Sequence, residues 1–302
     1  MSSSPTGFDA GRFLGDGSRL AAAIGAPWHS ERVRRTVEVF EERFHTEPTE
    51  WKTHSRPGDH LYYRFIDRKR RDNVETALRS ELIGESASTR FLRSWYERFG
   101  PAATASCDFR GDGALAKTWI FLGRSKPVEE VLDHRTVPNR LRAKVHVLKE
   151  AGMTEVFFVA LDHVQGSVNL YFKDRGTVPL ERPMEVLTNL GFSVPGAATV
   201  GAIRATEPNV GFPISITFSL EREKPVRACV YSLGIPEDRI PAVPERISRF
   251  LAAAPCYSAD TCVAVAWSIG AGDNAYLKAG KAYTGDMIGY MTEPLLPVNG
   301  AA

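Results

Sequence analysis

The stretch LAKTWIFLG, residues 115–123, has the length and apolar content of a buried β-strand, but its third residue is Lys117. Successive side chains of a strand point to opposite faces. Lys117 therefore shares a face with Trp119 and Phe121, and the mostly aliphatic residues between them form the other face. An ammonium group is almost never fully buried without a partner. The stretch predicts a strand with one face for packing and one face that is aromatic and cationic.

The composition is that of an ordinary globular protein. Of 302 residues, 43% are hydrophobic and 25% are charged, and the formal net charge is only +2. Such a small net charge favours neither nucleic acid nor an anionic membrane as a partner. The apolar run LAAAIGAPW, residues 20–28, is too short to span a bilayer and lacks the flanks of a secretory signal. We expect a cytoplasmic protein with no nucleic-acid or membrane partner.

The cysteines and histidines show no metal-ligand spacing. The four cysteines contain no C-x-x-C pair, which favours reduced thiols in the core. The seven histidines show neither H-x-H nor H-x-x-x-H spacing, so no metal centre is predicted.

Extended and helical segments alternate along the whole chain. Periodicity predicts five pairs of strands, each separated from the next pair by helices. The pairs are TEWKTHS with HLYYRFID, TASCDF with LAKTWIFLG, TEVFFVALD with SVNLYFKD, FPISITFSL with PVRACVYSL, and TCVAVAWSIG with NAYLKAGKAYTG. Helices are predicted near residues 30–44, 72–82, 88–100, 127–132, 139–152, 182–191, 243–254 and 286–291. No Gly/Ser-rich or Pro-rich linker interrupts the series, so we predict one domain over residues 1–302, with an ordered core from about 13 to 290.

This order predicts an α+β fold, in which an antiparallel sheet carries helices on one face. Closing ten strands into a barrel removes the exposed edges, and about eight strands already suffice to enclose a small ligand. We therefore expect a ten-stranded antiparallel β-barrel with an outer ring of α-helices.

Three further strands repeat the pattern of residues 115–123. In each of these strands, one of the two faces combines a cation or an amide with a large aromatic residue: Tyr62, Arg64, Asn169, Tyr171, Arg227 and Tyr231. Lys52 and Lys278 add two more cations. A surface strand with its polar side in water is the simplest alternative, but such a strand has little reason to expose so many aromatic rings.

A shared cavity accounts for both kinds of residue. Clustered cations repel one another unless an anion joins them, and aromatic walls shelter apolar or cationic groups. A ligand with a polyanionic head and an apolar tail that forms a carbocation, such as an allylic diphosphate, matches both properties.

Four stretches carry a resemblance to a known family. WKTHSRPGDHLYYRF (51–65), AKTWIFLG (116–123), SVNLYF (167–172) and AYLKAGKAYTGDM (275–287) resemble the ABBA-fold aromatic prenyltransferases, closest to the clorobiocin and novobiocin 4-hydroxyphenylpyruvate branch. The elements match in order from about residue 13 to 290. The resemblance implies a PT barrel of repeated αββα units, usually monomeric. It also implies an activity in specialised metabolism such as antibiotic biosynthesis: transfer of a dimethylallyl or geranyl group from its diphosphate to a carbon of a small, electron-rich aromatic acceptor.

The resemblance also assigns roles to residues by motif position. The positions that bind diphosphate in the family are Lys52, Arg64, Lys117, Asn169, Arg227 and Lys278. Those that line the prenyl and aromatic pocket are Trp119, Tyr171, Tyr231 and Val265, with Tyr283 at its rim. Lys117, Arg227 and Arg64 are the expected catalytic cations, because they would stabilise the leaving diphosphate.

Two departures from the family pattern refine this expectation. Some members carry a magnesium-binding aspartate where this chain has Tyr62, and a small polar residue where it has Arg64. A guanidinium can neutralise diphosphate in place of a metal, and no D-D-x-x-D cluster is present. We therefore expect no cofactor and magnesium-independent turnover.

The second departure concerns the acceptor. The hydroxyphenylpyruvate enzymes carry an arginine and a glutamate at the positions of Phe157 and Gly280. Without them the pocket is more apolar, and we expect a flatter acceptor: a hydroxynaphthoquinone, phenazine, carbazole or indole-type ring system. The group that removes the ring proton is unassigned, and water or the departing diphosphate could serve.

Other interpretations of the sequence fit its residues less well. A non-catalytic barrel that carries a hydrophobic or isoprenoid ligand is the main rival, although a carrier rarely needs so many inward-facing cations. SIGAGDNA (268–275) fits a dinucleotide fingerprint, but a strand-like segment follows it instead of a helix. RKRR (68–71) is typical of a solvated helix start. Asp108 is either a residue that orients an acceptor or a lysine, or a turn carboxylate.

Overall fold

Ten strands form one closed antiparallel barrel in the computed structural model, which describes residues 7–172, 180–206, 212–220, 225–258, 262–270 and 275–287. The order around the barrel is β1-β10-β9-β8-β7-β6-β5-β4-β3-β2, so every neighbour in sequence is a neighbour in space and β1 closes on β10. The strands are β1 (Thr49–His54), β2 (Leu61–Phe65), β3 (Thr104–Arg110), β4 (Leu115–Pro127), β5 (Glu155–Asp162), β6 (Ser167–Phe172), β7 (Ile214–Ser219), β8 (Pro225–Pro236), β9 (Cys262–Gly270) and β10 (Tyr276–Thr284). The predicted fold class is confirmed.

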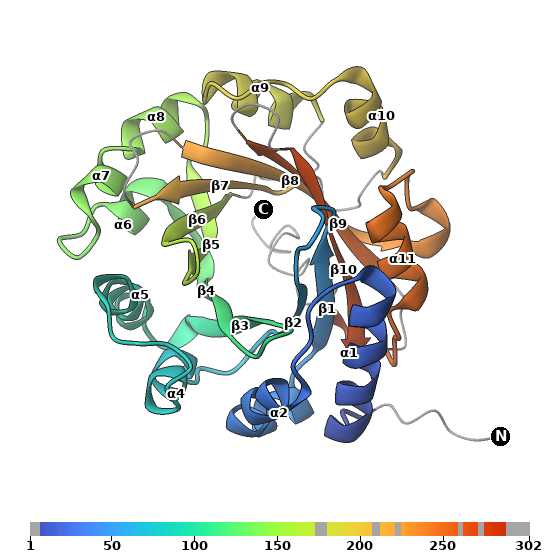
Figure 1. Cartoon of the computed structure of the whole chain (residues 1–302). Helices are drawn as coiled ribbons and strands as arrows, with labels where there is room; N and C mark the ends of the chain where they lie inside the picture. Colours follow the sequence, from blue (N-terminus) through green and yellow to red (C-terminus); the bar gives the residue numbers. More distant parts are fainter. Residues whose placement is uncertain are drawn as a thin grey trace, which may run out of the picture.

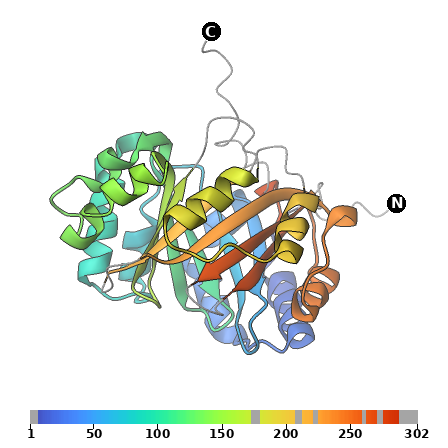
Figure 2. The same cartoon turned by 90° about the horizontal axis from the view of Figure 1, so that it is seen from above.

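The helices form a ring outside the barrel, as the view down its axis shows (Figure 1). Seen from above, they follow the outer side of the strand layer (Figure 2). They are α1 (Ala10–Ile24), α2 (Ser30–Val39), α3 (Glu41–Thr46), α4 (Asn73–Arg79), α5 (Ala87–Arg98), α6 (Val128–Leu132), α7 (Asn139–Arg142), α8 (Val145–Glu150), α9 (Glu181–Asn189), α10 (Ala197–Ala205) and α11 (Glu245–Ala253), with short 3₁₀ turns η1 (Gly100–Ala102) and η2 (Glu237–Arg239). The helix predicted near residues 286–291 falls mostly outside the described residues. Within the described ranges, no helix has the length and apolar character needed to cross a bilayer.

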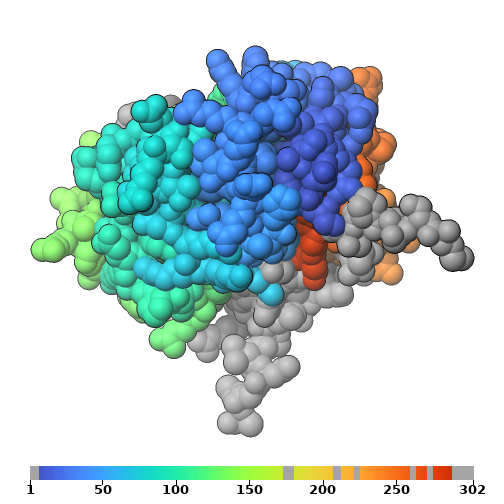
Figure 3. Space-filling view, turned by 90° about the horizontal axis from the view of Figure 1, so that it is seen from below, coloured from blue at the N-terminus to red at the C-terminus, as the bar shows by residue number. Residues whose placement is uncertain are grey.

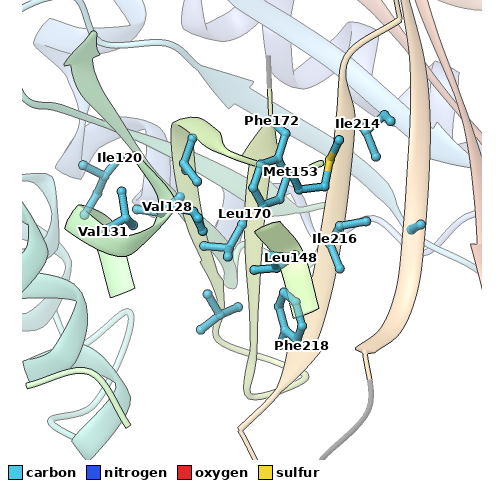
Figure 4. Packing of buried hydrophobic residues seen from close by; sticks show 14 of the residues in the cluster. Ile120, Val128, Val131, Leu148, Met153, Leu170, Phe172, Ile214, Ile216 and Phe218 are labelled. Atoms are coloured by element: carbon cyan, nitrogen blue, oxygen red, sulfur yellow. The ribbon is translucent and has the colours of Figure 1, made fainter. Parts of the chain in front are cut away.

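An aliphatic core fills the space between β4–β7 and the helices outside them. Ile120, Leu170 and Ile216 are fully buried there and belong to one cluster with Val128 of α6 and Leu148 of α8 (Figure 4). Burying one such side chain contributes about 1.5–3 kcal/mol. The aliphatic faces predicted from strand alternation are thus the outer faces of the barrel.

An aromatic core lies under the N-terminal helices, which cover one side of the molecule as a continuous layer (blue to cyan in Figure 3). Asp9 caps α1 by accepting a hydrogen bond from the backbone N–H of Arg12, and Gly25, at φ 62°, ends the helix in the left-handed region. Phe13 of α1 stacks on Trp51 of β1 with ring centroids 4.4 Å apart. This packing fixes β1, whose opposite face carries Lys52 into the barrel.

The strand register brings charged residues of opposite sign side by side on the inner face. Arg64 of β2 is opposite Asp108 of β3, and Lys117 of β4 is opposite Asp162 of β5. Directly opposed residues on one face of an antiparallel pair lie about 4.5–5.5 Å apart at Cβ. This part of the lumen is therefore lined by paired charges.

Candidate active site

The barrel lumen contains a cavity of about 300 Å³. This volume is within the range of small-molecule sites. Most of the predicted site residues line it: Lys52, Arg64, Lys117, Trp119, Phe157, Tyr171, Arg227, Tyr231, Lys278 and Gly280. They come from seven different strands, and the closure of the barrel brings them together.

Two predicted residues, Asn169 and Val265, contribute to the cavity wall differently from the others. Asn169 is buried beside the cavity wall, where its Oδ1 accepts a hydrogen bond from Thr217 Oγ1 at 2.5 Å. Its Nδ2 has no hydrogen-bond partner among the described residues. Val265 borders the cavity, but it is fully buried as part of the outer aliphatic core.

The placement of Tyr283 at the rim of the site is wrong. Tyr283 is fully buried in the aromatic core outside the barrel, where its ring meets that of Trp51 and its hydroxyl donates to Asp16 Oδ2 at 3.0 Å. The reason is strand parity: Lys278 and Gly280 face inward, so an odd-numbered residue of β10 faces the helices.

Four charges form a buried cluster on one side of the lumen: Glu50, Lys52, Arg64 and Asp108, here called the four-charge cluster. Lys52 Nζ contacts Asp108 Oδ2, and Arg64 Nε contacts Glu50 Oε2. Arg64 Nη1 also lies 3.9 Å from Asp108 Oδ1. Asp108 therefore orients a lysine and an arginine, and the alternative of a turn carboxylate is wrong. The two cations of this cluster are already balanced by two acids.

A second set of cations has less compensation: Lys117, Arg227 and Lys278, here called the cation triad. Lys117 Nζ lies 3.9 Å from Asp162 Oδ2, and Lys278 Nζ lies 3.1 Å from the Sγ atom of Cys229. Three cations beside one carboxylate leave a surplus of positive charge among the residues that the structure describes. An anionic ligand would be attracted to this part of the lumen.

Burial and mutual repulsion shift the titration of these groups. Burial, together with the nearby cations Lys278 and Lys52, lowers the pKa of Lys117 to about 7. Burial alone would raise the pKa of Cys229, but Lys278 and Arg227 lower it to about 7. Near neutral pH the Cys229 thiolate therefore compensates part of the positive charge of the triad.

An aromatic wall faces these charges. The ring centroid of Trp119 lies 4.7 Å from that of Tyr171, which is 5.9 Å from that of Tyr231. Phe157 and Phe158 extend the wall with centroids 5.0 Å apart. The Trp119 ring lies 5.7 Å from Lys117 Nζ and 5.4 Å from Arg64 Cζ. The cavity thus has an apolar wall next to its cations.

Sequence reasoning missed several residues of this cavity. Glu50 and His54 lie on the same inner face of β1 as Lys52, so their parity with Lys52 was the available signal. His54 Nδ1 lies 2.8 Å from Asp59 Oδ2, and Asp59 also accepts a hydrogen bond from the Tyr62 hydroxyl at 3.0 Å. Burial lowers the pKa of His54 to about 3. Tyr62 thus belongs to a hydrogen-bonded group at the cavity wall.

Comparison with known proteins gives the family. Residues 8–293 match the family described as aromatic prenyltransferase Orf2. A 4-hydroxyphenylpyruvate 3-dimethylallyltransferase of Streptomyces niveus is 34% identical over 282 residues, which cover 93% of this chain and 86% of the relative. An aromatic prenyltransferase of Sclerotinia sclerotiorum is 30% identical over 292 residues, covering 95% and 94%. The solved structure of 5-dimethylallyl tryptophan synthase from Streptomyces coelicolor in complex with DMASPP and Trp has a TM-score of 0.53, with 13% identity and 98% of both chains covered, and shares the fold.

The closed ten-stranded barrel is the PT-barrel fold that this solved structure shares. Within that class, the chain belongs to the aromatic prenyltransferase Orf2 family. The resemblance read from the four sequence stretches is confirmed.

Proposed function

We propose that this transferase moves a dimethylallyl or geranyl group from its diphosphate to a carbon of a small, electron-rich aromatic acceptor, releasing diphosphate without a divalent metal. The observation that supports it best is the cation triad beside an aromatic wall in one enclosed cavity. A relative of the same fold in complex with DMASPP and Trp supports a donor and an aromatic acceptor as the two substrates.

The triad would act on the leaving group. When the C–O bond of the donor breaks, its electron pair stays with diphosphate, which gains negative charge in the transition state. Lys117, Arg227 and Lys278 would stabilise that charge more strongly than the ground state. The unpartnered Nδ2 of Asn169 could donate to a phosphate oxygen. Lys52 and Arg64 would contribute less than the triad, because they are paired with acids.

The aromatic wall would protect the allylic cation. Trp119, Tyr171 and Tyr231 present π systems that stabilise a carbocation and keep water away from it. The same wall would hold the acceptor ring next to the cation, which lowers the entropic part of the barrier. The C–C bond then forms as the ring attacks the cation, and the ring finally loses one proton.

The acceptor is proposed to be flat and uncharged. Phe157 lies in an apolar group with Leu233 and Ala264, which offers no counter-ion for a carboxylate. A hydroxynaphthoquinone, phenazine, carbazole or indole-type ring suits this wall better than 4-hydroxyphenylpyruvate. We also infer that the protein acts as a cytoplasmic monomer: one chain closes the whole cavity, and Cys107, Cys229 and Cys256 are free thiols.

Calorimetry and mass spectrometry test this proposal. We expect micromolar binding of dimethylallyl diphosphate and of inorganic diphosphate, and loss of both in Lys117→Ala and Arg227→Ala. Incubation with both short allylic diphosphates and a panel of aromatics should give a prenylated product at an undiminished rate in EDTA. Arg204→Ala, which removes an exposed cation on α10, is the control for charge. Binding of the isoprenoid alcohol but not of diphosphate would support a carrier instead, and activity restored only by magnesium would refute metal independence.

A further inference from the structure

The Ser106 hydroxyl lines the lumen, and the protein does not use its proton. Ser106 lies two residues before Asp108 on the inner face of β3, and it is 6% exposed, so a ligand in the cavity can reach it. Its Oγ accepts a hydrogen bond from the backbone N–H of Asp67 at 3.0 Å. A hydroxyl has one donor and two acceptor positions. This contact occupies an acceptor position, and no acceptor among the described residues takes the Ser106 proton.

The segment that holds this hydroxyl is itself fixed in place. The buried Asp67 carboxylate accepts hydrogen bonds from Asn73 Nδ2 at 3.1 Å and from Arg71 Nη1 at 2.8 Å. Asn73 Nδ2 also donates to the backbone carbonyl of Ala105, the residue before Ser106. The first residue of α4 therefore holds both partners of the Asp67–Ser106 contact. A group fixed in this way loses little freedom when it binds a ligand.

Ser106 is next to the aromatic wall. It is directly opposite Trp119 in the register of β3 and β4. Opposed residues of an antiparallel pair have Cβ atoms about 4.5–5.5 Å apart. Ile66, which precedes Asp67, also lines the cavity. The lumen beside Ser106 thus has an aromatic and an aliphatic lining, and a flat ring packed on Trp119 would bring a substituent at its edge within reach of the hydroxyl.

Two other hydroxyls of the inner face already have side-chain partners. Ser215 Oγ lies 3.2 Å from the Tyr231 hydroxyl, and Thr217 Oγ1 donates to Asn169 Oδ1 at 2.5 Å. Both belong to β7, whereas Ser106 comes from β3. Ser106 therefore offers a donor that these two hydroxyls do not duplicate.

The surroundings of Ser106 favour the aromatic acceptor over the diphosphate as its ligand. The surplus positive charge of the lumen lies with the cation triad, which attracts the diphosphate. On the strands beside β3, Lys52 and Arg64 are paired with Asp108 and Glu50. A neutral hydroxyl next to apolar side chains suits an uncharged oxygen.

We propose that the Ser106 hydroxyl donates a hydrogen bond to a ring-bound oxygen of the aromatic acceptor and so determines which ring carbon faces the allylic cation. This inference rests on the proposed prenyl transfer. The oxygen belongs to a carbonyl, a hydroxyl or an ether group, because each has a lone pair that accepts. Of the acceptor classes proposed above, a hydroxynaphthoquinone carries such oxygens, whereas unsubstituted carbazole and indole rings carry none.

Three acceptors test this role, with dimethylallyl diphosphate as the donor. They are a hydroxynaphthalene, its methyl ether and the corresponding aminonaphthalene, all with electron-rich rings. Both oxygen compounds can accept a hydrogen bond, but the lone pair of the amine is delocalised into the ring and accepts poorly. We expect Ser106→Ala to lower kcat/KM about tenfold for the two oxygen compounds and less than about twofold for the amine, as the loss of one neutral hydrogen bond predicts. The ratio of prenylated isomers of the hydroxynaphthalene should also change.

Further variants separate the hydroxyl from the fold. Ser106→Thr keeps the hydroxyl and should retain both the rate and the isomer ratio. Ser106→Cys has a thiol of similar shape that donates weakly, and it repeats the comparison if alanine destabilises the protein. The matched control is Ser94→Ala, which removes a hydroxyl of α5 that donates to the carbonyl of Phe91 at 2.7 Å outside the barrel. Inorganic diphosphate should bind all these variants with unchanged affinity.

The outcomes distinguish this inference from the proposed function. A wild-type protein that prenylates none of the three acceptors would refute the proposed function and this inference with it. An active wild-type protein whose Ser106→Ala and Ser106→Cys variants lose nothing, or lose equally on all three acceptors, would refute only the role of Ser106. Equal losses would mean that Ser106 acts by holding Asp67. A selective loss with an unchanged isomer ratio would refute the orienting role.

Discussion

Lys117 makes the proposed diphosphate site sensitive to pH. Burial lowers the pKa of its ammonium group to about 7, so Lys117 is charged below this value and neutral above it. We expect the affinity for dimethylallyl diphosphate to fall as the pH rises from 6 to 9. Isothermal titration at four pH values measures this dependence.

Lys117→Arg is the variant that isolates the effect. A guanidinium remains charged over the whole range, so the variant should show a flatter dependence than the wild-type protein. Comparing the two proteins also cancels the titration of the ligand itself. Identical slopes would mean that another group controls the pH dependence.

At the scale of single residues, strand parity predicted the inward cations but not their partners. Lys52, Lys117 and Arg227 line the cavity because alternation is fixed by the strand itself. The acids Glu50 and Asp162 approach them from neighbouring strands, and that pairing depends on the register of the barrel. A single sequence contains no direct measure of the register between strands. The pairing of the inward cations with these acids was therefore not predictable.

At the scale of elements, α1 is expected to contribute strongly to stability through Phe13. This ring is 1% exposed and stacks on Trp51. Phe13→Ala removes a large buried side chain and should lower the free energy of unfolding by about 3–5 kcal/mol. Urea unfolding followed by tryptophan fluorescence measures the change.

The control for this prediction is Val147→Ala on α8, where the valine is 41% exposed. It should change the free energy of unfolding by less than about 0.5 kcal/mol, as surface substitutions usually do. If Phe13→Ala were as mild as this control, the packing of α1 on β1 would not support the barrel.

Helical periodicity in the sequence predicted which residues are buried more accurately than it predicted where helices begin and end. The spacing of Val33, Val37, Phe40 and Phe44 predicts one helical face, and all four residues are buried. The structure nevertheless divides them between α2 and α3, because Phe40 leaves the helical region at φ −114° and ψ 26°. The predicted helix at residues 139–152 likewise consists of the short helices α7 and α8. Periodicity indicates which side of a segment is buried. A local change of backbone angles that ends one helix and begins another leaves this periodicity almost unchanged, so the sequence does not reveal the boundary.

At the scale of the whole molecule, we expect the fold to lose stability in mild acid. Burial lowers the pKa of His54 to about 3 and that of His163 to about 4, below the value of about 6.5 in an unfolded chain. The unfolded state therefore binds more protons as the pH falls below about 6.5. The stabilisation is complete above that pH and is lost on the way down to about 3.

Urea midpoints at pH 7.5, 6 and 5 test this expectation. The decrease should be smaller in His163→Asn, which removes one of the two groups; at about 1.4 kcal/mol for each pH unit, His163 accounts for at most about 3 kcal/mol. A midpoint that does not change between pH 7.5 and 5 would contradict the expectation.

The architecture as a whole was the most predictable feature. Five hairpins with helices on one side predict an antiparallel sheet. Closing this sheet into a barrel removes its exposed edges, and the observed barrel is closed. The identity of the residues at the cavity was less predictable. Tyr283 shows why: its stretch resembles the family closely, but a resemblance of motifs does not by itself state on which side of a strand a residue lies.

The pairing of β1 with β10 has a consequence for how the protein matures. Glu50 and Lys52 stand on one side of this seam, and Gly280 and Lys278 on the other, so the proposed reaction centre is assembled from opposite ends of the polypeptide. During synthesis on the ribosome, β1 is made long before β10, with which it pairs in the folded protein. A nascent chain that stops before β10 lacks Lys278 and Gly280, so the proposed centre is complete only after β10 has been synthesised.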